Sequence, residues 1–301
     1  MRRLSVVDLM LLGTVLLWAL NVTVTKYVLQ HGFRPLAYAT IRYFAATSLF
    51  WCFTYARERS FRVRLADWQL IAAAAVLIYV NQIGFVYGVD KAGAATVALI
   101  LGTTPIWVGI IATLVGFERL QRSFWAAAVL SFAGVALVAG GTGGFSSRIG
   151  GDALAVLTAT TWAGYSIAIA PLMRRYSPFR ISALVLALGW VPLAVTGIAQ
   201  TLHQGFRFSA LTWLGSGYAV VGPLFLTNIL WFTAIARVGP SRASLFANMQ
   251  PFFGVVFALV LLGEHLNGWE VAGGLAIFAG IALERVRRRP LEPVIATTAR
   301  E

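Results

Sequence analysis

A semi-polar stripe runs along the first apolar segment of the chain. Its members follow one another at spacings of four, three and four residues and are Thr14, Trp18, Asn21 and Thr25. These spacings place them on one face of a helix. Hydroxyl and amide groups that face lipid cost free energy, so this face is expected to point into a helix bundle. There it could bond neighbouring helices or contact a polar solute.

Amide side chains recur in two later apolar segments. Tyr79 and Gln82 share a helix face with Asn81 beside them, and Asn228 lies about one helical turn before Trp231. Amides both donate and accept hydrogen bonds, which suits a zwitterionic or neutral polar solute. A neighbouring aromatic wall suits an apolar side chain or ring. Hydrogen bonding between helices is the other use of such amides.

Two prolines stand beside polar side chains within apolar segments. The prolines are Pro105 and Pro251, and their polar neighbours are Thr103, Thr104, Asn248 and Gln250. A proline leaves a carbonyl free one turn earlier, and a nearby hydroxyl or amide can satisfy that carbonyl. The pattern predicts either a static kink or a hinge at a gate.

Arg42, seven residues after Pro35, is the only basic residue well inside an apolar segment. An arginine at the middle of a membrane helix costs about 2.5–3.5 kcal/mol on insertion scales, so it indicates function by default. The alternative is that Arg42 reaches the outer interface with its long side chain. Asp8, Asp152 and Glu284 lie only at segment ends. Proton coupling through a central carboxylate is therefore not expected.

The sequence contains no pattern of residues that is typical of a catalytic or metal-binding site. The three histidines lie in loops, without a Ser-His pair or paired aspartates within the apolar segments, and are His31, His203 and His265. The single cysteine, Cys52, excludes disulfide frameworks and cysteine-rich metal sites. We therefore expect no enzyme, no metal and no cofactor.

The elements that must position these residues are membrane helices. The 301 residues are 59% apolar and 12% charged, with a mean hydropathy of +0.78, which excludes a water-soluble globule. Apolar runs of about 20 residues satisfy their own backbone hydrogen bonds in lipid as helices. We predict an all-α membrane protein with ten spans, at residues 6–29, 36–55, 69–88, 94–116, 123–140, 152–172, 181–200, 211–234, 243–262 and 269–284.

The distribution of basic residues predicts the orientation of these spans. If the N-terminus is cytoplasmic, 18 of the 24 lysines and arginines fall in cytoplasmic segments and five on the opposite side. This bias follows the positive-inside rule and places both termini in the cytoplasm. We therefore attribute the net charge of +13 to the basic residues that orient the chain in the membrane. We expect contact with membrane lipid and none with nucleic acid.

The two halves of the chain repeat one another. A shift of 146 residues matches 12 of the 45 positions from 93 to 137, among them Pro105 with Pro251 and Glu118 with Glu264. A shift of 144 matches Trp18 with Trp162. Five spans per half make the second repeat enter the membrane from the opposite side, as in alternating-access carriers. The predicted units are 1–143, 144–285 and a basic cytoplasmic tail, 286–301.

With these residues the sequence resembles the drug/metabolite transporter superfamily, specifically its EamA-like branch. The resemblance covers nearly the whole chain and rests on the run from Leu99 through Pro105 to Glu118-x-Leu120 and on its echo from Leu245 to Glu264-x-Leu266. It implies a secondary carrier of small metabolites, often an exporter of amino acids or related compounds. It also implies a central cavity lined by spans 1, 3, 4, 6, 8 and 9, with spans 5 and 10 standing apart.

These arguments predict an exporter of amino acids or related small polar or aromatic compounds in the cytoplasmic membrane. A flippase of a lipid or lipid-linked sugar is the alternative. We expect a monomer or weak homodimer, with Pro105 and Pro251 as hinges and Arg42 as the intramembrane charge. The candidate substrate-binding residues are Trp18, Asn21, Tyr79, Asn81, Gln82, Thr103, Thr104, Trp162, Tyr165, Asn228, Trp231 and Asn248.

Overall fold

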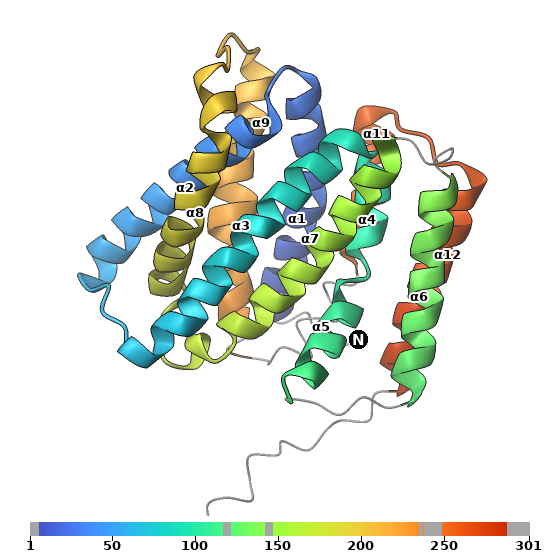
Figure 1. Cartoon of the computed structure of the whole chain (residues 1–301), viewed down its shortest axis with the longest axis horizontal. Helices are drawn as coiled ribbons and strands as arrows, with labels where there is room; N and C mark the ends of the chain where they lie inside the picture. Colours follow the sequence, from blue (N-terminus) through green and yellow to red (C-terminus); the bar gives the residue numbers. More distant parts are fainter. Residues whose placement is uncertain (1–5, 117–121, 142–146, 235–236, 238–248, 288–301) are drawn as a thin grey trace, which may run out of the picture.

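The computed structural model describes residues 6–116, 122–141, 147–234, 237 and 249–287. Helices make up nearly all of this part of the chain, and it contains no strand (Figure 1). The predicted all-α class is therefore confirmed for the described residues. The candidate residue Asn248, the carboxylate of Glu118 and the end of the tail lie outside them.

The helices follow the predicted apolar segments along the chain. The first half contains α1 (Val6–Gln30), α2 (Pro35–Glu58), α3 (Trp68–Lys91), α4 (Ala94–Leu101), α5 (Thr104–Leu114) and α6 (Arg122–Gly141). The second half contains α7 (Ser147–Ile169), α8 (Pro178–Leu202), α9 (Ala210–Val220), the π-helical turn η3 (Val221–Leu226), α11 (Gln250–Leu262) and α12 (Gly268–Arg287). Helical residues continue from η3 to 234.

Six segments of the described residues are long and apolar enough to cross a membrane. They are Val6–Gln30, Leu65–Lys91, Ala94–Leu114, Gly150–Arg174, Pro178–Leu202 and Ala210–Ala234. Helices α2, α6, α11 and α12 occupy the other predicted spans. The chain is thus a multi-pass membrane protein, while the count of ten remains a prediction.

The predicted kink at Pro105 lies at the junction of α4 and α5. The helix breaks at Gly102 and Thr103, and Pro105 stands in the first turn of α5. The proline cannot donate to the carbonyl of Leu101, and the hydroxyl of Thr104 donates to that carbonyl instead at 2.7 Å. The hydroxyl therefore satisfies the freed backbone group, as expected.

Helices from the two halves pack against one another in pairs. α3 lies against α7, α2 against α8, and α4 against α11, while α6 and α12 form a pair to one side of the bundle (Figure 1). Glycines permit the closest approaches. A Cβ at Gly84 of α3 would lie 2.8 Å from Oγ1 of Thr158 and 3.0 Å from the carbonyl oxygen of Leu154 on α7.

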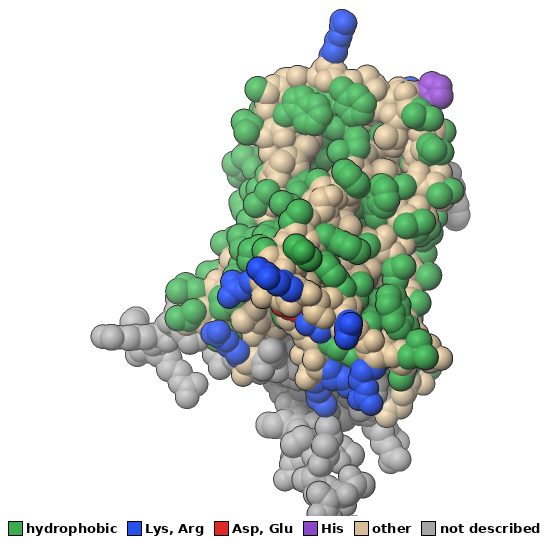
Figure 2. All heavy atoms as spheres, turned by 90° about the vertical axis from the view of Figure 1, so that its left-hand side faces the viewer, with side chains coloured by type: hydrophobic (Ala, Val, Ile, Leu, Met, Phe, Trp, Pro, Cys, Tyr) green, Lys and Arg blue, Asp and Glu red, His purple; other side chains and the backbone are tan. Residues whose placement is uncertain are grey.

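Charged side chains gather at one end of the molecule, whereas apolar side chains cover the face between its ends (Figure 2). At this charged end the segment between α2 and α3 is tied to the segment between α7 and α8. Arg175 pairs with Asp67 at 2.5 Å, and Arg180 pairs with Glu58 at 2.7 Å. These ion pairs link the two halves at the end that the sequence predicts to be cytoplasmic.

At the other end, Glu264 caps a helix of the opposite half. A carboxylate at the end of a span is well placed to cap the N-terminus of the next helix in sequence. Instead, the carboxylate of Glu264 accepts hydrogen bonds from the backbone N–H groups of Ala94 and Ala95 at 2.9 Å each, at the start of α4. The next helix, α12, is capped by Asn267 and Glu270, which exchange backbone and side-chain hydrogen bonds. Glu264 therefore joins the halves.

Candidate functional site

A cavity of about 110 Å³ lies between the two halves of the bundle. It is polar on some walls and aromatic or aliphatic on others. The lining residues named in the sequence as candidates are Trp18, Asn21, Arg42, Asn81, Gln82, Thr104, Trp162, Tyr165 and Asn228. Candidates from α1, α2, α3, α5, α7 and the helix after η3 thus lie around one space.

Three tryptophans form an aromatic wall beside this cavity. The ring of Trp18 on α1 lies 5.4 Å from Trp162 on α7 in an edge-to-face arrangement and 5.0 Å from Trp231. Trp162 in turn lies 5.3 Å from the ring of Tyr165. The indole N–H of Trp18 donates to Oγ1 of Thr227 at 2.9 Å, so its polar atom is satisfied within the protein. The wall therefore presents mainly ring surface.

A chain of hydrogen-bonded polar side chains also lines the cavity. Nη2 of Arg42 donates to Oε1 of Gln82 at 2.5 Å, and Nε2 of Gln82 donates to Oδ1 of Asn81 at 2.9 Å. Nδ2 of Asn81 then donates to the backbone carbonyl of Thr158 on α7 at 2.9 Å. These bonds fix the orientation of both amides and connect α2, α3 and α7.

Arg42 is buried, with 2% of its surface exposed. Its second contact is a long bond of 3.5 Å from Nη1 to Asn21, and Nε is buried without a hydrogen-bond partner. The guanidinium carbon lies 4.9 Å from the ring centre of Tyr38 and 5.6 Å from that of Phe85. The side chain therefore points into the bundle among aromatic rings, and the interpretation that it reaches the outer interface is not supported.

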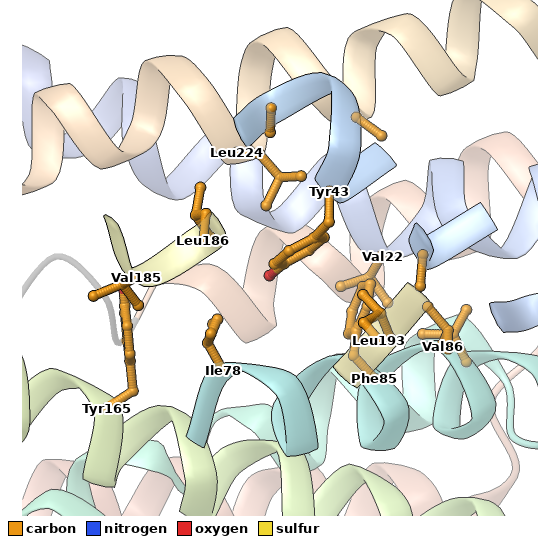
Figure 3. Close-up of a cluster of buried hydrophobic side chains, with 14 of the residues drawn as sticks. Val22, Tyr43, Ile78, Phe85, Val86, Tyr165, Val185, Leu186, Leu193 and Leu224 are labelled. Atoms are coloured by element: carbon orange, nitrogen blue, oxygen red, sulfur yellow. The ribbon is translucent and has the colours of Figure 1, made fainter. Parts of the chain in front are cut away.

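Aliphatic and aromatic side chains close the remaining sides of the cavity. Tyr43, Ile78, Phe85, Leu186 and Leu224 line it from α2, α3, α8 and η3. Figure 3 shows these side chains lying toward one another from the surrounding helices. The cavity thus combines a charged and amide-rich part with an apolar part.

Five described candidates, the two prolines among them, do not line the cavity. The ring of Trp231 packs against the ring of Trp18. The side chain of Tyr79 is partly buried and packs against the hydrophobic core. Thr103 is fully buried and donates to the carbonyl of Ile100 at 2.7 Å. Pro105 lies just beyond the break between α4 and α5.

The second predicted hinge, Pro251, also lies outside the cavity lining. A Cβ placed on Gly102 would come within 3.0 Å of Cγ of Pro251, so the break in the first half lies against the proline of the second half. Hinge motion at either proline remains a prediction.

Several lining residues were not among the candidate substrate-binding residues. Tyr43 follows Arg42 directly in α2, which was a usable signal. Thr158 lies one helical turn before the candidate Trp162, and Gln250 was noted only as a neighbour of Pro251. Pro223 lies within the π-helical turn, and no helical periodicity predicts that turn.

The set of lining helices is wider than the resemblance implied. Arg42 and Tyr43 bring α2 to the cavity, and Leu186 brings α8. These are the second and seventh predicted spans, which the resemblance left out. The fifth and tenth predicted spans, α6 and α12, contribute no lining residue among those described, in agreement with it.

Comparison with known proteins gives one family. A model of the EamA-like transporter family matches residues 5–140 and again residues 149–284. A protein of Salmonella typhimurium named as a probable amino-acid metabolite efflux pump is 26% identical over 289 residues, covering 91% of this chain and 94% of that protein.

A further relative and a solved structure are also similar to this chain. A probable terminal-alkyne amino-acid exporter of Streptantibioticus cattleyicolor is 27% identical over 235 residues, 76% of each chain. A solved crystal structure is similar with a TM-score of 0.67 at 17% identity, covering 96% of this chain and all of that one. At that identity the structure shows the shared fold alone.

Proposed function

This chain belongs to the EamA-like transporter family, and from that premise we propose that it exports amino acids or related small metabolites. Transport would proceed across the cytoplasmic membrane by alternating access through the central cavity. Two relatives are named as a probable amino-acid metabolite efflux pump and a probable amino-acid exporter. Their names support this substrate class.

The observation that carries the proposal is the mixed character of the cavity. Amides and Arg42 occupy one part, and Trp18 and Trp162 form an aromatic wall at another. A small solute with a polar head and an apolar side chain satisfies both parts at once. A purely apolar compound would leave the buried amides and guanidinium without partners, at a cost in free energy.

The pattern of helix contacts supports an inverted repeat. Suppose that each predicted span changes places with the span five positions later. The contacting pairs α2–α8, α4–α11 and α6–α12 then map onto themselves. The same exchange converts the contact of α3 with α7 into that of α1 with the segment from α9 through η3, and both contacts occur. A pseudo-two-fold relation of this kind gives two equivalent arrangements, one open to each side.

The basic end of the molecule supports a cytoplasmic location for the loops after α2 and α7. Arg57, Arg59, Arg62 and Arg64 lie at or after the end of α2, and Arg174, Arg175 and Arg180 lie between α7 and α8 or at the start of α8. With this end inside, the N-terminus and the tail after α12 are cytoplasmic as well.

Counterflow in proteoliposomes tests the proposed function. Vesicles preloaded with a panel of amino acids, amines and nucleosides should take up labelled amino acid only when the purified protein is present. Leu224→Trp should reduce uptake at least tenfold, because Leu224 lines the cavity and indole would fill it. Leu226→Trp is the matched control, since Leu226 belongs to the same turn and is 40% exposed.

Two outcomes would contradict this assignment. One is the absence of exchange for every compound of the panel, although the protein is folded and inserted. The other is exchange by Leu224→Trp at the rate of wild type and of Leu226→Trp, which would move the solute path away from the cavity.

A further inference from the structure

Among the described residues, the charge that faces the cavity is entirely positive. Among the lining residues the one with a permanent charge is Arg42, and none is an aspartate or glutamate. Two ion pairs among the described residues join Arg175 to Asp67 and Arg180 to Glu58, both at the charged end of the molecule. A guanidinium keeps its proton at any ordinary pH, so this charge persists in the empty cavity.

The contacts of Arg42 leave its charge incompletely compensated. Its partners are the neutral amides of Gln82 and Asn21, and the bond to Asn21 is long at 3.5 Å. The buried Nε makes no hydrogen bond. Neutral amides compensate a buried cation less well than a carboxylate does, because an amide carries no net opposite charge.

From these contacts we infer that the cavity binds its solute through a carboxylate, for which Arg42 supplies the counter-charge. This inference rests on the proposed function and names the chemical class of the solute. Two guanidinium N–H groups can hold both oxygens of a carboxylate at once. The rings of Tyr38 and Phe85 flank the guanidinium and hold its plane while the partner changes.

The rest of the cavity indicates the remainder of the solute. Trp18, Trp162 and Tyr165 offer ring surface for an aromatic or branched aliphatic side chain. The side chain of Asn228 donates to the carbonyl of Leu224 at 2.5 Å, so its oxygen remains available as an acceptor. An ammonium group without a carboxylate would instead meet the unopposed charge of Arg42. The favoured class is therefore small monocarboxylates with an apolar side chain, amino acids among them.

Matched compounds separate the carboxylate from the rest of the solute. The probes are L-phenylalanine, L-phenylalaninamide, 3-phenylpropionate and phenethylamine, together with the corresponding leucine series. Binding to the purified protein is followed through tryptophan fluorescence, since Trp18 and Trp162 line the cavity. We expect the amino acid of at least one series to bind, and its amide and amine to bind at least tenfold more weakly.

Variants of Arg42 test whether the preference for a carboxylate depends on this side chain. Arg42→Gln should weaken binding of the amino acid at least tenfold and abolish the preference for carboxylate over amide, whereas Arg42→Lys should retain part of it. Arg34→Gln is the matched control, because Arg34 precedes the same helix and is exposed. Should Arg42→Gln fail to fold, the ratio of acid to amide binding in wild type and Arg42→Lys still decides the question.

The outcomes distinguish this inference from the proposed function. Equal binding of acid and amide, or an unchanged preference in Arg42→Gln, overturns the inference. Exchange of a nucleoside or an amine in proteoliposomes, with no binding in either series, also overturns it and leaves a metabolite carrier in place. Absence of exchange for all compounds contradicts both.

Discussion

Nη2 of Arg42 lies 2.5 Å from Oε1 of Gln82, so the buried charge of α2 is held by an amide of α3 on the wall of the cavity. Gln82 bonds Asn81, and Asn81 bonds the backbone of Thr158 in the second half. A change at the guanidinium therefore reaches α7 through three hydrogen bonds. If a solute carboxylate displaces Gln82, this link between the halves is altered at the moment of binding.

Replacing either cavity amide should reduce transport without loss of folded protein. Gln82→Ala removes the strongest partner of Arg42, and Asn228→Ala removes an acceptor on the opposite wall. Gln82 orients both Arg42 and Asn81 in the cavity wall, so we expect Gln82→Ala to lower solute flux about tenfold, which corresponds to about 1.4 kcal/mol. Counterflow at matched protein content measures this.

The control for these variants lies in the same helix. Gln69 of α3 is exposed and distant from the cavity lining, so Gln69→Ala should keep wild-type flux. Wild-type flux in both Gln82→Ala and Asn228→Ala would remove the amides from the transport path.

Gly134→Ala should lower the melting temperature in detergent by several degrees. A Cβ at this position would lie 2.6 Å from the carbonyl oxygen of Gly273 and 2.8 Å from the backbone nitrogen of Ile277, so α6 and α12 would have to separate. Overpacking of this kind costs about 1–3 kcal/mol. At Gly13 of α1 a Cβ meets no atom within 4 Å, and Gly13→Ala should leave the melting temperature unchanged or raise it. Equal effects of both variants would disprove the close packing of the pair.

Transport should require no proton gradient. In the described part of the chain, the cavity lining contains no carboxylate or histidine that could take up and release a proton. Counterflow should therefore proceed at the same rate with equal pH on both sides and with an imposed pH gradient at zero membrane potential. Accumulation of a neutral zwitterion only when protons flow would contradict this, and Asp8→Asn would then test the carboxylate nearest the N-terminus.

A tag at residue 301 should be accessible from the cytoplasm alone. The basic tail after α12 and the arginines after α2 both favour this side. Protease digestion of the tag in inside-out vesicles, but not in intact cells, is the expected result. Digestion in intact cells would contradict this topology, and the predicted orientation of both repeats would then have to be reversed.

Sequence alone predicted the helices and much of the cavity lining. Trp18 and Asn21 were recognised because polar and aromatic groups on one helix face are expected to point away from lipid. This expectation requires no knowledge of tertiary contacts. Arg42 was recognised for the same reason. We predicted that these residues lie around one cavity because similar residues recur at matching positions in the second half of the chain.

Other features depend on how the helices rotate and slide against one another. Glu264 caps α4 of the other half because helix packing brings it there, whereas sequence proximity suggested α12. Tyr43 lines the cavity because α2 presents two successive residues to it, which a single-face periodicity does not predict. The same periodicity gives no sign of the π-helical turn that brings Pro223 and Leu224 to the cavity.

Access of a single cysteine to reagents from the two sides tests the central claim most directly. In a Cys52→Ser background, Leu224→Cys places a thiol on the cavity wall, and Val86→Cys places one in the fully buried core outside it. The account predicts that a charged, membrane-impermeant thiol reagent modifies Leu224→Cys in right-side-out and in inside-out vesicles. It also predicts that transported solute slows both reactions and that Val86→Cys stays unmodified. Modification of Leu224→Cys from one side only, or at a rate that solute does not change, would contradict alternating access through this cavity.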